Sequence, residues 1–206
     1  MLMRKLFLSS YFKEVSHLFE DFVSEDLKGK TVTFIPTASL VEKFKFYVET
    51  GRKALKKMGL TIDELEISTA TYEEISKKLQ QNDYIYVSGG NTFFLLQELK
   101  RTGSDKIIIE QVNLGKLYIG ESAGSVVVAP NIEFVKDIDN YQKAPDLNSF
   151  NSLGLVDFYV VPHYTNFPFK KVTRKVISKY EDDLLLQPIS NAQAILVSDD
   201  IKVVTK

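Results

Sequence analysis

The sequence contains no cysteine, only two histidines and no long apolar segment. Without cysteine the chain forms no disulfide bond, no thiolate metal site and no cysteine nucleophile, so covalent catalysis would need another nucleophile. We expect a cytoplasmic protein, because disulfide-free chains are common in that compartment. No stretch approaches the roughly 18 apolar residues of a membrane span, and the apolar part of residues 1–14 is too short for a signal peptide.

The chain also lacks an excess of charge of either sign. Its 206 residues carry a net charge of −1, with an isoelectric point near 6.2. Such a protein has no long-range field that would attract nucleic acid or an anionic membrane, so we expect neither as a partner. The basic run at residues 51–59 is typical of a solvated helix face. The length predicts a single domain spanning residues 1–206, present as a monomer or a homodimer.

Short β-rich segments alternate with helical patterns along the chain. This alternation predicts an α/β fold with a doubly wound, mostly parallel sheet and helices on both of its faces. The last residues, 192–206, predict a C-terminal antiparallel hairpin that turns at Asp199 and Asp200. The expected strands lie at 5–10, 31–39, 62–68, 83–90 and 116–120, with a further strand running into a loop at 155–164, and the expected helices lie at 11–27, 41–59, 71–81, 91–101, 105–114 and 169–181.

Residues 120–124, Gly-Glu-Ser-Ala-Gly, follow an apolar strand and precede an apolar segment. Small residues ease any turn from strand to helix, so the pattern by itself is weak. The same pattern is the nucleophile elbow, in which flanking glycines let the chain turn sharply and expose a serine hydroxyl above the sheet. Its position after a strand favours Ser122 as a nucleophile. The amide of Ala123 would then be placed to stabilise an oxyanion.

The segment Val-Ser-Gly-Gly-Asn at residues 87–91 follows another apolar strand. It could be an ordinary turn with Asn91 as the helix cap, or it could present an amide toward Ser122 as the second oxyanion donor. Beside a nucleophile elbow the second interpretation is favoured.

A serine nucleophile needs a base, and the two histidines differ in position. His17 lies within the amphipathic first helix, away from any strand end, and is expected to be structural or solvated. His163 follows the apolar run Phe-Tyr-Val-Val-Pro, where a side chain can reach over the edge of the sheet. We therefore expect His163 to be the base. The residues alone do not choose the acid that orients it among Glu133, Asp137, Asp139, Asp146 and Asp157.

Several motifs together resemble the peptidase E family of α-aspartyl dipeptidases, which is related to cyanophycinase and shares the fold of class I glutamine amidotransferases. The resemblance covers nearly the whole chain. The motifs are KLFLSSY at 5–11, GGNTFFLLQ at 89–97, LYIGESAGS at 117–125, PNI at 130–132, PHYTN at 162–166 and the terminal hairpin.

The resemblance implies a serine peptidase that hydrolyses dipeptides without metal or organic cofactor. It makes Ser122 the nucleophile and His163 the base, with the oxyanion amides at Gly90 and Ala123. It selects Asp137, fifteen residues after the serine, over Asp139 as the triad acid.

By the same resemblance, Arg174 would bind the aspartyl carboxylate of a substrate, a task suited to a planar bidentate donor, or it could be a solvated helix residue. Two departures from the family pattern weigh against strict specificity for Asp. Glu121 places an anion next to the serine unless its side chain points away. Residues 164–173, between His163 and Arg174, lack a Gly-containing acidic stretch.

Two other functions fit the same residues. The order Ser, Asp, His also occurs in esterases of the α/β-hydrolase type, for which this chain is short. A binding or regulatory protein could keep the fold and lack turnover. We favour the peptidase, with a small peptide as its substrate.

Overall fold

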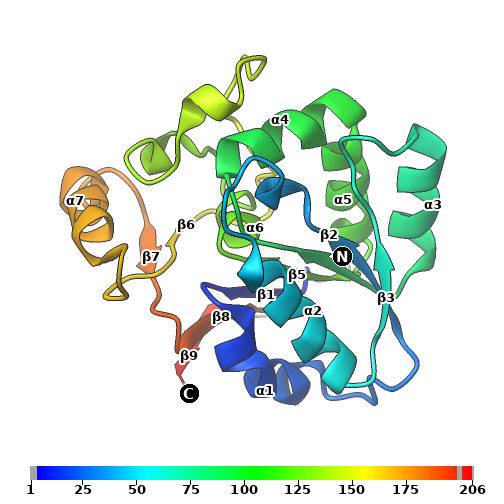
Figure 1. The fold of residues 1–206 in the computed structure, drawn as a ribbon. Coiled ribbons are helices and arrows are strands. Elements are labelled where there is room, and N and C mark those ends of the chain that lie inside the picture. The colour runs from blue at the N-terminus through cyan, green and yellow to red at the C-terminus, as the bar shows by residue number, and fades with distance from the viewer. Residues whose placement is uncertain (1–3, 199–200, 206) are drawn as a thin grey trace.

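The computed structural model describes residues 4–198 and 201–205, in which a seven-stranded sheet forms the centre of the molecule (Figure 1). Its strand order is β3-β2-β4-β5-β1-β8-β9. The first five strands run parallel, whereas β8 is antiparallel to β1 and β9 is antiparallel to β8. The predicted α/β class and terminal hairpin are confirmed, although the turn at Asp199 and Asp200 lies outside the described residues. The strands are β1 (Leu6–Ser9), β2 (Thr31–Ile35), β3 (Thr61–Glu64), β4 (Tyr84–Val87), β5 (Leu117–Glu121), β8 (Gln193–Val197) and β9 (Ile201–Thr205).

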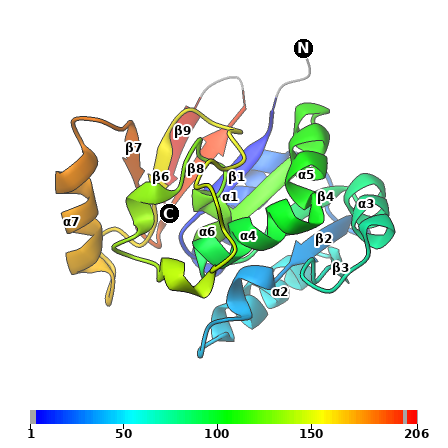
Figure 2. The same cartoon turned by 90° about the horizontal axis from the view of Figure 1, so that it is seen from above.

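A second, two-stranded sheet lies beside the main one and was not foreseen. It pairs β6 (Tyr159–Val161) with β7 (Leu186–Pro188) in parallel, and α7 (Lys170–Tyr180) connects the two strands. Figures 1 and 2 show this unit, in yellow and orange, at the opposite side of the molecule from β3. The strand that precedes His163 therefore belongs to this small sheet.

Helices cover both faces of the main sheet (Figure 1). Residues of α1 and α2 share one buried cluster, and residues of α3, α4, α5 and α6 share another. The Thr71 side chain accepts a hydrogen bond from the Glu74 amide and so caps α3. The helices are α1 (Phe12–Val23), α2 (Phe46–Lys57), α3 (Tyr72–Gln81), α4 (Thr92–Thr102), α5 (Ser104–Asn113) and α6 (Ala123–Val126), with short 3₁₀ turns at Thr37–Ser39, Glu133–Val135 and Tyr141–Lys143. No helix within the described residues is both long enough and apolar enough to cross a membrane.

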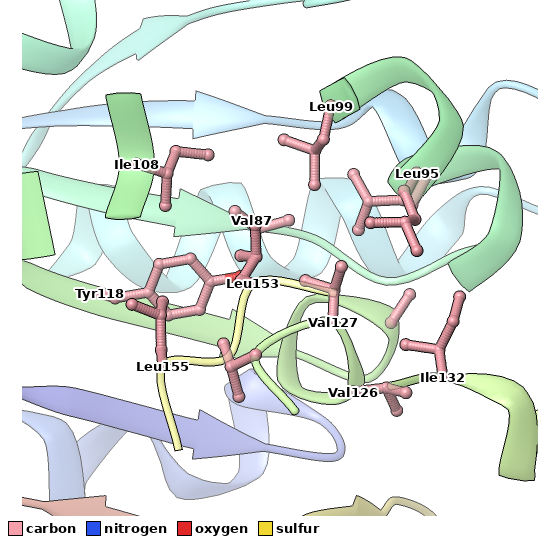
Figure 3. Packing of buried hydrophobic residues seen from close by; sticks show 14 of the residues in the cluster. Val87, Leu95, Leu99, Ile108, Tyr118, Val126, Val127, Ile132, Leu153 and Leu155 are labelled. Atoms are coloured by element: carbon pink, nitrogen blue, oxygen red, sulfur yellow. The ribbon is translucent and has the colours of Figure 1, made fainter. Parts of the chain in front are cut away.

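The two faces of the sheet are packed with different side chains. Aromatic rings dominate the face under α1 and α2, where Phe34 and Tyr86 stack with their centroids 4.9 Å apart. Aliphatic side chains dominate the other face. There Val87 and Tyr118 of the sheet lie beneath Leu99 of α4 and the segment carrying Val127 (Figure 3). Because this second cluster extends under α6, it holds the turn that carries Ser122 against the sheet.

Gly124 permits α6 to lie directly against β4. A Cβ atom at this position would overlap the carbonyl oxygen of Val87, so only glycine allows the approach. The Tyr118 hydroxyl donates a hydrogen bond of 2.7 Å to the Gly124 carbonyl from the neighbouring strand.

Replacing Gly124 by alanine is expected to lower the free energy of unfolding by about 2–3 kcal/mol, because the added methyl group overpacks a rigid contact. Gly154→Ala is the matched control. Unlike Gly124, Gly154 has open space around it, at a φ of 58°, so its substitution should cost only about 1 kcal/mol of backbone strain. Chemical denaturation of both variants measures the difference, and equal losses would contradict the role given to Gly124.

Candidate active site

Ser122 lies on a strained turn between β5 and α6. Its φ of 50° and ψ of −108° are unusual for a residue with a side chain and are typical of positions held for function. A Cβ atom on Gly120 would lie 2.7 Å from the Gly124 carbonyl oxygen, so the glycines on either side of the serine are needed for the turn. The Ser122 amide donates to the Ser9 carbonyl at 2.9 Å. The predicted nucleophile elbow is present in its geometry.

His163 lies beside this turn. Its Nε2 atom is 3.0 Å from the Ser122 hydroxyl oxygen, and its Nδ1 atom is 2.8 Å from the side-chain oxygen of Asn191. Because an amide oxygen only accepts, we assign the proton to Nδ1, which leaves Nε2 free to accept from the serine hydroxyl. Burial lowers the pKa of His163 below its ordinary value of 6.5, although the hydrogen bond to Asn191 opposes this shift. The imidazole is therefore neutral near pH 7 and can act as a base.

Neighbouring groups fix the position of His163. The Ser10 hydroxyl accepts a hydrogen bond of 3.0 Å from the His163 amide, and the ring of Phe169 stacks on the imidazole with centroids 4.7 Å apart. The backbone amide of Asn191 donates to the side-chain oxygen of Asn166 at 2.8 Å. This hydrogen bond joins the loop that carries Asn191 to the loop that carries His163. The imidazole thus has little freedom to turn away from Ser122.

The expectation that Asp137 orients His163 is wrong in this structure. Asp137 lies at the surface, where its carboxylate pairs with Lys175 at 2.9 Å and Lys179 at 3.4 Å. Both lysines project from α7 one turn apart. The hydrogen bond from Lys175, together with the charges of both lysines, lowers the pKa of Asp137. Asp139, the alternative acid, accepts from the Thr92 amide at 2.8 Å instead. Among the described residues, Asn191 is the partner of Nδ1.

Gly90 and Ala123, the expected oxyanion residues, line the same cavity as Ser122. Gly90 has a φ of 139°, and a Cβ atom there would overlap the Ala38 carbonyl, so this position requires glycine. The adjacent Gly89 approaches the serine closely, since its Cβ would lie 3.1 Å from the Ser122 Cβ. Within the described part of the chain, neither the Gly90 amide nor the Ala123 amide has a hydrogen-bond acceptor. Both are available to a ligand.

Arg174 is not in a position to bind a substrate at this site. It is exposed on α7 and is not among the residues that line the cavity above Ser122. The alternative interpretation, a solvated helix residue, describes it correctly. His17 is also exposed, on α1, as expected.

A cavity of about 830 Å³ opens above Ser122 and His163. Its size is in the range of sites that hold small organic ligands. Phenylalanines and prolines form much of its wall, together with glycine and asparagine from the Gly89–Asn91 loop. No group of three or more His, Asp or Glu side chains within residues 4–198 and 201–205 is placed to hold a metal ion.

Glu121 does not project toward the serine hydroxyl. Its carboxylate accepts from the Phe12 amide at 3.0 Å and from the Tyr86 hydroxyl at 2.6 Å, on the α1 and α2 face of the sheet. Successive residues of a strand point to opposite faces, so a residue next to the elbow can be fully buried below it. Burial raises the pKa of Glu121 to about 7, while these two hydrogen bonds oppose the rise.

Sequence reasoning missed Asn191 and the serines at the end of β1. Asn191 follows the small strand β7, and an asparagine in a loop carries no signal of its own. Ser9 and Ser10 carry a weak one, because two hydroxyls at the end of a buried apolar strand need partners. The Ser9 hydroxyl donates to the Gly120 carbonyl at 3.1 Å, and the Ser10 hydroxyl accepts from the His163 amide at 3.0 Å.

Comparison with known proteins places this geometry in context. The profile of peptidase family S51 matches residues 5–204. An uncharacterized peptidase of Listeria innocua is 55% identical over 99% of this chain and 97% of its own. Peptidase E of Haemophilus influenzae is 32% identical over 77% of this chain and 72% of its own. A crystal structure is known for a Listeria monocytogenes protein described as a candidate peptidase E, whose sequence is 54% identical to this chain. The match covers 99% of this chain and 98% of that chain, with a TM-score of 0.94.

The buried Glu121 makes stability depend on pH. Its folded-state pKa of about 7 lies above the ordinary value of 4.5, so its contribution to stability is full below pH 4.5 and is lost as the pH rises through 7. Glu121→Gln, which cannot ionise, should therefore gain stability relative to the wild type, by up to about 3 kcal/mol, between about pH 5 and about pH 8. Urea denaturation of both proteins across this range measures the difference. A constant difference would show that Glu121 does not titrate there.

Proposed function

The chain belongs to peptidase family S51, and from this premise we propose that it is a serine-type peptidase acting on short peptides, with Ser122 as nucleophile and His163 as base. The observation that carries the proposal is the 3.0 Å contact between the Ser122 hydroxyl and the His163 Nε2 at the strained turn. A nucleophile within hydrogen-bond reach of a base, whose other nitrogen is held by a third group, is the arrangement that activates serine.

The reaction follows from the positions of these groups. His163 Nε2 takes the proton of the Ser122 hydroxyl as the oxygen attacks the peptide carbonyl. The negative charge that develops on the carbonyl oxygen is stabilised by the free amides of Gly90 and Ala123. His163 then gives its proton to the leaving amine, and the C–N bond breaks to leave an acyl-enzyme. Water, deprotonated by the same imidazole, hydrolyses the ester and restores Ser122.

The third member of this proposed triad is Asn191 rather than an aspartate. A neutral amide keeps the imidazole in the required tautomer and orientation, which does not need a charge. It stabilises the imidazolium less than a carboxylate would. Because Arg174 lies outside the cavity, the proposal covers short peptides in general and includes no preference for an N-terminal Asp.

Ser122→Ala should abolish turnover in a panel of dipeptides that varies the first residue, with the variant still folded by circular dichroism. A fluorophosphonate probe should label the wild type at this serine and leave the variant unlabelled. Undiminished peptide hydrolysis by Ser122→Ala would end the proposal. Cleavage of aryl esters without cleavage of peptides would favour an esterase, and a folded wild type that neither reacts nor cleaves would favour a binding protein.

Asn191→Asp should raise the pKa of His163, because a carboxylate stabilises the imidazolium. The base works only when neutral, so the acidic limb of the kcat/KM profile should move to higher pH. Asn191→Ala should lower kcat by about 10²-fold, since the imidazole loses its orienting partner. Asn148→Asp is the matched control, because it adds the same charge at an exposed position outside the cavity. An acidic limb that stays in place in Asn191→Asp would contradict the assignment of Asn191.

A further inference from the structure

Solvent-exposed phenylalanine side chains surround the cavity above Ser122. Phe167 is 95% exposed, Phe44 is 76% exposed and Phe46 is 68% exposed. These are the strongly exposed phenylalanines of the described residues, and all of them line this one cavity. Single exposed apolar residues need no explanation, but a group of them around a concave site is typical of a surface that binds an apolar ligand.

Phe167 lies four residues after His163 and lines the same cavity. Two residues further on, Phe169 stacks on the His163 imidazole with centroids 4.7 Å apart and an angle of 22° between the rings. In the proposed reaction the imidazole returns its proton to the leaving amine. The residue that follows the scissile bond must therefore lie next to His163 and next to this aromatic surface.

The wall near His163 is apolar and uncharged. Between residues 162 and 169, the side chains that line the cavity besides His163 are those of Pro162, Phe167, Pro168 and Phe169. The cationic lining residues come from elsewhere in the chain. Lys143 is paired with Glu42 at 2.8 Å, and Lys43 is exposed. A charged substrate side chain beside His163 would thus lose water without gaining a partner from these wall residues.

We propose that Phe167 and Phe169 form a subsite for the residue after the scissile bond, and that this subsite selects an apolar, above all an aromatic, side chain. The inference rests on the proposed function, because it takes His163 as the group that protonates the leaving amine. Phe167 is the specificity-determining residue in this subsite. Its exposed ring is free to be covered by the substrate, whereas Phe169 also supports the imidazole.

The test compares peptides that share the best first residue from the dipeptide panel and carry Phe, Leu, Gly, Ser or Asp in second place. For the wild type, kcat/KM should be at least about tenfold higher with Phe than with Gly. In Phe167→Ala this ratio should fall about fivefold or more. Leu114→Ala is the matched control, because Leu114 is 57% exposed and lies outside the cavity, so the ratio should stay at its wild-type value.

A binding measurement tests the subsite apart from turnover. The chain contains no tryptophan, so the emission of a peptide with Trp in second place reports binding to Ser122→Ala directly. The Phe peptide should displace it at about tenfold lower concentration than the Gly peptide, and adding Phe167→Ala should remove that advantage. If the Phe peptide binds better than the Gly peptide but the wild type hydrolyses neither, the proposed peptidase activity is refuted and the proposed subsite is retained. Equal displacement by Phe and Gly peptides, an unchanged ratio in Phe167→Ala, or no peptide binding at all would overturn the subsite.

Discussion

Two consecutive serines at the end of β1 hold the site together. The Ser9 carbonyl accepts the Ser122 amide at 2.9 Å, and the Ser10 hydroxyl accepts the His163 amide at 3.0 Å. Strand β1 lies between β5 and β8 in the main sheet, so its end is fixed from both sides. Ser122 and His163 come from segments 41 residues apart, and the last residue of β1 and the residue that follows it bind these two segments. Hydrogen bonds at a fully buried strand end are costly to leave unmade, which makes this arrangement rigid.

The position of His163 depends on Ser10 because His163 lies outside the main sheet. His163 follows a strand of the small β6–β7 sheet, whose strands pair only with each other among the described residues. Its orienting partner Asn191 follows the other strand of the same sheet, and the two loops are joined through Asn166. His163 and Asn191 therefore belong to one local unit. Ser10 also donates to the Ile189 carbonyl at 3.0 Å, so one hydroxyl fastens both loops of this unit to the main sheet.

The sequence pointed to Ser122 and His163, but it did not point to the residue that binds the His163 Nδ1 atom. Ser122 and His163 were recognisable because each follows an apolar strand, and the ends of strands are where a sheet presents side chains for chemistry. The third residue was not, because a spacing of fifteen residues after the serine does not fix the direction of a loop. In this chain two lysines of α7 take the carboxylate of Asp137. Asn191 was not found because it follows β7, a short strand that the sequence did not predict.

The amide at position 191 changes the balance of the site. Burial already lowers the pKa of His163, and a carboxylate partner would offset that shift, whereas the amide only moderates it. The imidazole consequently stays neutral, and able to accept the serine proton, to lower pH. In the proposed reaction, the amide stabilises the imidazolium of the transition state less than a carboxylate would. The nearby Glu121 does not replace the missing charge, because its carboxylate is directed to Phe12 and Tyr86 on the far face of the sheet. In the proposed reaction, the amide therefore favours a neutral His163 at the expense of a less stabilised imidazolium.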